Sequence, residues 1–238
     1  MSDADAPAEP LEARLERAEP KEILRWALLE SGLERVAVAS SFQAEGTCVL
    51  HMATELRPDI PVLFLDTGFH FPQTLAFRDR LVGRLNLNLV ELRGDYTPET
   101  QAAAFGDRLY ERDPDLCCRL NKVEPFTRAL HGFDAWITAL RRDSSPSRAG
   151  VPIVERYELE PGHPMAKVNP VARWTRRKVW DYLKEHDLPH NPLYDRGYMQ
   201  VGCAPCTRLS RAGEHERAGR WDGSMKTECG LHVRAGRG

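Results

Sequence analysis

Two spacings of apolar residues recur along the chain, one typical of buried strands and the other of amphipathic helices. Short apolar runs that end in turn-forming residues predict strands over 35–41, 60–68, 86–94 and 133–140. Apolar residues three or four positions apart predict helices over 21–32, 44–56, 71–85 and 116–130. The last of these helices contains Pro125, where we expect an interruption.

This alternation predicts an α/β fold, a parallel sheet with helices on both faces. Beyond it, two shorter runs over 152–159 and 165–171 are candidates for a hairpin, and a helix is expected over 175–186 with Thr175 as its N-cap. Ligands of parallel sheets bind at the carboxyl ends of the strands. The loops of interest are therefore 40–47, 65–71 and 139–148.

Composition narrows the class of protein. The 238 residues are 42% hydrophobic and 29% charged, which suits one compact domain or one domain with appendages. The formal net charge of -2 gives no general attraction to nucleic acid or membranes, and no apolar stretch is long enough to span a bilayer. The acidic N-terminus lacks the features of a signal peptide, so we expect a cytoplasmic protein.

Four of the six cysteines form two pairs, the adjacent Cys117 and Cys118 and the C-x-x-C pair Cys203 and Cys206. Four thiolates suit a [4Fe–4S] cluster or a structural zinc ion. Neighbouring side chains on a helix diverge by roughly 100°, which is awkward for tetrahedral zinc and favours the wider cluster. Zinc, a thioredoxin-type redox pair and simple burial of small side chains remain the alternatives.

The other two cysteines have different settings. Cys48 falls in the expected helix 44–56 and is interpreted as a core residue. Cys229 lies in the sequence KTECGLH, within a polar and glycine-rich tail. A mobile segment suits a nucleophile that must reach a partner, and an inert exposed thiol is the alternative.

Two clusters of arginines, over 141–148 and 214–221, are candidates for anion binding, together with Lys122. Arginine forks match the oxygens of phosphate and sulfate, although most arginines in any chain are only solvated surface charges. The loop 40–47 offers backbone N–H groups at the start of a helix, a second candidate anion or nucleotide site. It is not a Walker A loop, because no G-K-[ST] follows.

Taken together, the motifs resemble those of the assimilatory sulfonucleotide reductases, and most closely the bacterial, iron–sulfur, thioredoxin-dependent adenylylsulfate (APS) reductases. The motifs span about residues 36 to 232 and are SSFQAE, LDTGFHFPQT, CCRLNKVEP, AWITALRRDSSPSR, VNPVARWT, NPLYDRGYMQVGCAPCT, GRWDG and KTECGLH. Gln43, Ala139 and Ser144 depart from the family pattern. None of these departures affects a cysteine.

The resemblance implies an adenine nucleotide α-hydrolase-like fold, related to the PP-loop ATP pyrophosphatases, and three parts of the chain. These are a disordered leader over 1–18, a nucleotide-binding reductase domain with the iron–sulfur site over 19–210, and a flexible C-terminal arm over 211–238. The cluster ligands would be Cys117, Cys118, Cys203 and Cys206. The residues implied to contact the phosphosulfate are Lys122, Arg148, Arg217, Arg220 and His232. Those implied to line the adenosine pocket are Ser40, Ser41, Phe42, Asp66, Thr67 and Gly68.

The implied reaction has two halves. The thiolate of Cys229 attacks the sulfur of APS and AMP leaves, and then thioredoxin releases sulfite from the S-sulfocysteine. The sequence does not decide whether the protein forms a homo-oligomer.

Three other functions are alternatives to APS reduction. Reduction of the 3'-phosphorylated nucleotide PAPS is the first alternative, although relatives preferring PAPS generally lack the four cluster cysteines. An ATP pyrophosphatase or thiolation enzyme would need an S-G-G-x-D-S loop, which is missing here. A non-enzymatic iron–sulfur sensor would leave the ECGLH motif without a role.

Overall fold

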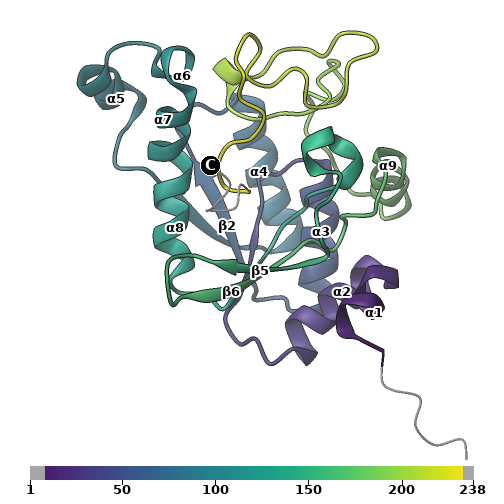
Figure 1. Ribbon diagram of the computed structural model, residues 1–238. Helices are drawn as coiled ribbons and strands as arrows, with labels where there is room; N and C mark the ends of the chain where they lie inside the picture. The colour runs from purple at the N-terminus through teal and green to yellow at the C-terminus, as the bar shows by residue number, and fades with distance from the viewer. Residues whose placement is uncertain (1–8, 233–238) are drawn as a thin grey trace, which may run out of the picture.

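Within residues 9–232, the part of the chain that the computed structural model describes, six strands form one sheet in the order β3-β2-β1-β4-β6-β5 (Figure 1). All neighbouring pairs are parallel except β5 and β6, which pair as an antiparallel hairpin. The parallel sheet and the hairpin were both predicted from the pattern. The strands are β1 (Val36–Ala39), β2 (Pro61–Asp66), β3 (Asn88–Arg93), β4 (Ala135–Ile137), β5 (Val154–Glu158) and β6 (Pro164–Val168).

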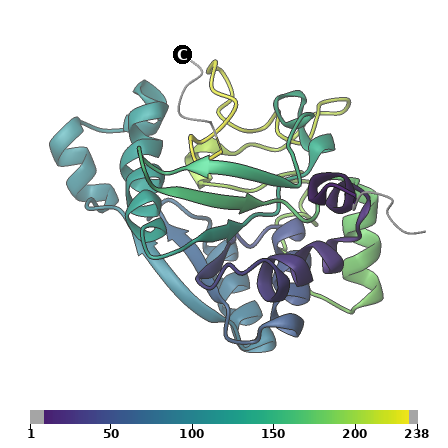
Figure 2. The ribbon, with the colours of Figure 1, turned by 60° about the horizontal axis from the view of Figure 1, so that its bottom comes forward.

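Helices cover both faces of this sheet, as predicted. Alternate residues of β1 face opposite sides, so that Val36 and Val38 enter one apolar core and Ala37 enters another. The larger core packs beneath α3 (Ala44–Leu56), α4 (Pro72–Leu85) and α9 (Arg176–Glu185), and the smaller one beneath α8 (Glu124–Leu130). Figure 2 shows the two groups of helices on opposite sides of the strands.

The remaining helices are short. They are α1 (Leu11–Arg17), α2 (Pro20–Arg25), α5 (Pro98–Phe105), α6 (Leu109–Arg112) and α7 (Pro114–Cys118), with π-helical turns η1 (Trp26–Glu30) and η2 (Arg119–Val123) and 3-10 turns η3 (Arg142–Ser144), η4 (Pro146–Arg148) and η5 (Ala204–Cys206). The interruption expected near Pro125 takes the form of η2, because the proline ring would clash with the carbonyl group four residues earlier in a regular helix.

Part of the expected leader is folded. The helix α1 lies within residues 1–18, where we predicted disorder, and it is held because Leu15 is buried and Glu16 pairs with Arg142. Residues 1–8 lie outside the described part of the chain. Thr175 caps α9 as predicted, since its side chain accepts a hydrogen bond from the backbone N–H of Lys178.

The described residues of the C-terminal arm, 211–232, pack against the domain in this structure. Figure 1 shows this yellow segment crossing the top of the molecule. Arg217 and Trp221 are buried there, because the arm covers polar loops at the edge of the sheet. The final part, 233–238, lies outside the described residues. Among the helices of residues 9–232, none has the length and apolar character needed to cross a bilayer.

Candidate active site

A cavity opens at the carboxyl ends of β1, β2 and β4, where the strand order reverses direction along the sheet. Its floor includes Ser40 and Ser41 after β1, and its roof comes from the arm. Loops from three strands and the C-terminal arm thus converge on one space. Eight of the residues expected to contact the substrate or to act as the nucleophile line it, namely Ser40, Ser41, Lys122, Arg148, Arg217, Arg220, Cys229 and His232.

The loop after β1 is shaped by tight local contacts. Ser40 Oγ accepts a hydrogen bond from the N–H of Phe42 at 3.1 Å, and a Cβ atom at Gly46 would lie only 2.8 Å from the same oxygen. A side chain at position 46 would therefore force the serine hydroxyl to move. Phe42 turns the chain with φ 55° and places its ring in the core against Phe64. The ring of Phe42 therefore belongs to the larger core and is not among the side chains that line the cavity.

Of the turn after β2, His70 lines this cavity, whereas Asp66, Thr67 and Gly68 are not among its lining residues. Asp66 pairs with Arg93 at 3.0 Å and accepts a hydrogen bond from the N–H of Gly68. Thr67 Oγ1 lies 3.4 Å from Cys203 Sγ. Thr67 therefore contacts one of the paired cysteines, while Leu65 and His70 line the cavity.

A second, smaller cavity is lined by all four paired cysteines. Cys117 and Cys118 come from α7, whose first turn is capped by Asp113. Cys203 is the N-cap of η5 and Cys206 is its last residue. Among the described residues, no three of these sulfurs lie within 4.8 Å of one another, whereas tetrahedral zinc–thiolate bonds of about 2.3 Å would draw the sulfurs closer than that. The four thiols around this one small cavity form a donor set that suits a metal centre.

Lys122 joins the two cavities, because it lines both of them, as does Cys203. Burial alone would lower the pKa of the Lys122 ammonium group, but the nearby sulfurs of Cys203, Cys118 and Cys229 raise that pKa overall. The lysine is therefore charged, and it stands between the cysteine site and the cavity that contains Cys229.

The arginines and the histidine of the cavity lie in an electropositive and mostly buried environment. Burial and the nearby Arg148 lower the pKa of Arg217 to about 10, so it keeps its charge at neutral pH. Burial, followed by the charges of Arg148, Lys167 and Arg217, holds the pKa of His232 well below its ordinary value. The imidazole is therefore neutral at physiological pH and stacks on Trp136 with 5.7 Å between ring centroids.

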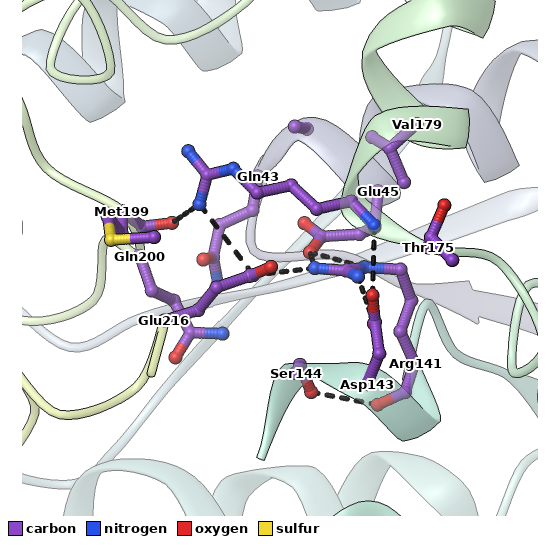
Figure 3. Close-up of polar contacts among 12 residues, drawn as sticks. Gln43, Glu45, Arg141, Asp143, Ser144, Thr175, Val179, Met199, Gln200 and Glu216 are labelled. Carbon is purple, nitrogen blue, oxygen red and sulfur yellow. Dashed lines mark hydrogen bonds and ion pairs between the residues drawn. The ribbon is translucent and has the colours of Figure 1, made fainter. Parts of the chain in front are cut away.

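Arg141 is a central residue that the sequence did not single out from its cluster. It is fully buried, and its guanidinium group pairs with Glu45, Asp143 and Glu216 (Figure 3). These carboxylates come from α3, from the loop after β4 and from the arm. Arg141 thus connects the cavity wall to its roof.

Other residues at the site were missed because their importance depends on the fold. Gln200 accepts a hydrogen bond from Arg217 at 2.8 Å, and Glu228 pairs with both Arg148 and Arg217. Two family departures also have clear contacts. The side-chain oxygen of Gln43 accepts from the N–H of Val201, and the hydroxyl of Ser144 donates to the carbonyl oxygen of Arg141. Of these residues, Glu228 alone had a signal in the sequence, because it lies next to Cys229.

The sheet order and the position of the cavity are those of an adenine-nucleotide-binding α/β protein of the PP-loop type. FMN adenylyltransferase from Candida glabrata shares this fold, with a TM-score of 0.56 at 17% identity over 87% of this chain and 69% of that one. A model described as the phosphoadenosine phosphosulfate reductase domain matches residues 35–209. The chain belongs to this family of sulfonucleotide reductases.

Individual relatives agree with this placement. The chain is 46% identical to an adenosine 5'-phosphosulfate reductase of Streptomyces coelicolor over 92% of its length and 90% of the relative. It is 42% identical to the protein of the same name from Halalkalibacterium halodurans, over 92% and 93%. The solved structure of a PAPS reductase from Candida auris, a phosphate complex, superposes with a TM-score of 0.70 at 29% identity, over 83% and 94%. The resemblance inferred from the motifs is confirmed.

Proposed function

We propose that this protein reduces adenosine 5'-phosphosulfate to sulfite and AMP in sulfate assimilation, with Cys229 as the nucleophile. One observation carries the proposal: Cys229 lines the same cavity as Lys122, Arg217, Arg220 and His232, at the ligand-binding edge of the sheet. The relatives named adenosine 5'-phosphosulfate reductase supply the substrate class.

The first half of the reaction is a displacement at sulfur. The Cys229 thiolate forms a bond to the sulfur of the sulfate group while the S–O bond to the phosphate breaks, and AMP leaves with the electron pair. The cations of the cavity neutralise oxygens that would otherwise repel the thiolate. The product is an S-sulfocysteine on Cys229.

The second half needs an external dithiol, for which thioredoxin is the proposed partner. One of its thiolates attacks Sγ of Cys229, and sulfite leaves with the electron pair of the S–S bond. The second thiol of the partner then resolves the mixed disulfide and regenerates the Cys229 thiol. The reducing equivalents therefore come from the dithiol. Because thioredoxin must reach Cys229, the arm has to open between the two halves.

A [4Fe–4S] cluster is the proposed cofactor, held by Cys117, Cys118, Cys203 and Cys206. The small cavity lined by all four thiols supports it. Bound there, the cluster would supply fixed charge next to Lys122. We expect about four iron and four sulfide ions per chain in wild type. Cys203→Ser should lose them, whereas Cys48→Ser should keep them, because Cys48 is buried beneath α9 with its sulfur near the carbonyl of Val179.

Reduction of PAPS is the second candidate, because a relative from Gloeobacter violaceus at 42% identity is named phosphoadenosine 5'-phosphosulfate reductase. The two nucleotides differ by a 3'-phosphate. Comparing kcat/KM for APS and PAPS decides between them, and we expect the larger value for APS.

Mass spectrometry tests the covalent step directly. Purified holoprotein mixed with APS, and with no thioredoxin, should gain one SO3 group on the peptide that contains Cys229. Cys229→Ser should gain none and should release no sulfite. A wild-type protein that turns over APS without ever carrying this adduct would contradict the mechanism.

A further inference from the structure

Glu228, the residue before the proposed nucleophile, is held by two buried arginines. Its Oε1 accepts from Arg148 Nε at 2.7 Å, and its Oε2 accepts from Arg148 Nη2 at 2.8 Å and from Arg217 Nη2 at 3.0 Å. Arg217 also donates to the carbonyl oxygen of Thr227 at 2.9 Å. Little of this group is open to solvent, since the side chains of Arg148, Arg217 and Glu228 are 11%, 7% and 12% exposed. We call this contact the arm latch.

The latch changes what Arg148 can do. Nε and Nη2 form the edge of a guanidinium group that would otherwise grip a phosphate or sulfate in bidentate fashion, and both donate to Glu228. Arg217 is different, because its buried Nε has no hydrogen-bond partner among the described residues and it lines the cavity. Arg217 therefore keeps a donor for a ligand, whereas the forked edge of Arg148 is used by the arm.

The residues after Cys229 are also fixed. Gly230 has φ +92°, and a Cβ atom there would lie 3.0 Å from Val123 Cγ2, so the chain turns tightly against the residue that follows Lys122. Leu231 then packs against the smaller apolar core, and His232 stacks on Trp136. Cys229 is thus held from both sides, by the latch before it and by the turn after it.

We propose that Glu228 and Arg148 are positioning residues for the sulfonation step: their ion pair places the Cys229 arm over the substrate, while Arg217, Arg220 and Lys122 bind the anion. This proposal rests on the proposed function of Cys229. Removal of either latch residue leaves the nucleotide site and the thiol intact but frees the segment that carries the thiol. Misplacement of a nucleophile by even about 1 Å slows a reaction about 100-fold.

The test compares two reactions of the same thiol in the holoprotein. In Glu228→Gln and Arg148→Met, single-turnover formation of the S-sulfo adduct from APS should slow by about 10- to 100-fold. Alkylation of Cys229 by iodoacetamide, followed on the same peptide, should be as fast as in wild type or faster, because the freed arm exposes the thiol. The Kd for AMP, measured by calorimetry, should stay within about three-fold or decrease. The two changes should not add in the double variant, because each breaks the same contact.

Glu214→Gln is the matched control. Glu214 is another carboxylate of the arm that pairs with an arginine, but its partner Arg208 does not line the cavity. We expect wild-type rates of both thiol reactions in this variant.

Each outcome points to one conclusion. A wild-type rate of sulfonation in Glu228→Gln would overturn the proposed role of the latch. A Kd for AMP more than about three-fold higher in Glu228→Gln or Arg148→Met would also overturn it, because these residues would then bind the nucleotide themselves. Additive effects in the double variant would also overturn it. Absence of the adduct in wild type would instead overturn the proposed function, and the AMP and iodoacetamide measurements would still report on the latch.

Discussion

His232 illustrates how one side chain couples the arm to pH. Its ring lies flat on Trp136 beside several cations, and these surroundings hold its pKa well below the ordinary value of about 6.5. The closed arm therefore binds the proton more weakly than the open arm does. By linkage, closure is fully stabilised above the ordinary pKa and is lost progressively as the pH falls below about 6.5.

The prediction is a pH-dependent opening that a phenylalanine abolishes. Protease cleavage of residues 211–232 should speed up in wild type as the pH falls from about 7.5 to 5.5, relative to His232→Phe, because Phe keeps the stack but binds no proton. Taking the ratio of the two cleavage rates at each pH cancels the pH dependence of the protease itself. A constant ratio would show that protonation of His232 does not open the arm.

At the scale of single residues, the sequence identified the reactive side chains but not the residues that they contact. The four paired cysteines and Cys229 were recognised because their types and spacings are rare, and the structure brings each of them to a cavity. Glu228 lies 80 residues from Arg148, and no local pattern shows that the two meet. The burial of the Phe42 ring in the core could not be predicted either, because a loop motif does not reveal which way each side chain turns.

Among the elements, the loop after β4 connects several others through ion pairs. Arg141 lies in this loop, and with 1% of its side chain exposed it pairs with carboxylates from α3, from its own loop and from the arm. Figure 3 shows the three acids around the single guanidinium group. Burial opposes ionisation of Arg141, yet Glu45 and Glu216 raise its pKa overall, so the group stays charged.

Replacement of Arg141 should therefore be costly. In Arg141→Met the buried Glu45 and Glu216 lose their common partner, and we expect the free energy of unfolding to fall by about 3–5 kcal/mol in urea titrations of the holoprotein. Arg177→Met is the control, because its pair with Asp181 is largely exposed and should contribute less than about 1 kcal/mol. A loss in Arg141→Met no larger than in the control would show that the three carboxylates are stabilised by other groups.

The boundaries of a helix could be predicted where buried apolar residues recur along its whole length. The expected helix 44–56 matches α3, because a buried apolar stripe runs through its length. The helix α5 was not predicted, although Thr97 caps it and Pro98 begins it, since Gln101 is its one buried residue and it has no apolar stripe. A helical spacing of apolar residues arises when one face of a helix is buried. A helix that lies on the surface therefore lacks this pattern and cannot be predicted from it.

Considered as a whole, the molecule brings distant segments together at the two cavities. Cys117 and Cys118 lie on α7, whereas Cys203 and Cys206 lie in the loop that leads to the arm. That same loop supplies Gln200 and Val201 to the larger cavity. A group bound by all four thiols would fasten this loop to the helix, and through the loop it would stabilise the roof of the nucleotide site.

Removal of iron should therefore loosen the site without unfolding the sheet. After anaerobic treatment with an iron chelator, we expect the far-ultraviolet circular dichroism to change little, because the cores on both faces of the sheet contain none of the four paired cysteines proposed to hold the cluster. Protease cleavage within 199–232 should become faster, and the Kd for AMP should rise by about 10-fold, a loss of about 1.4 kcal/mol. Cys48→Ser treated in parallel should respond as wild type does. If the chelated protein instead kept its AMP affinity and its resistance to cleavage, the loop would be held by protein contacts alone, such as the 2.7 Å hydrogen bond from the N–H of Ala204 to the carbonyl oxygen of Phe69.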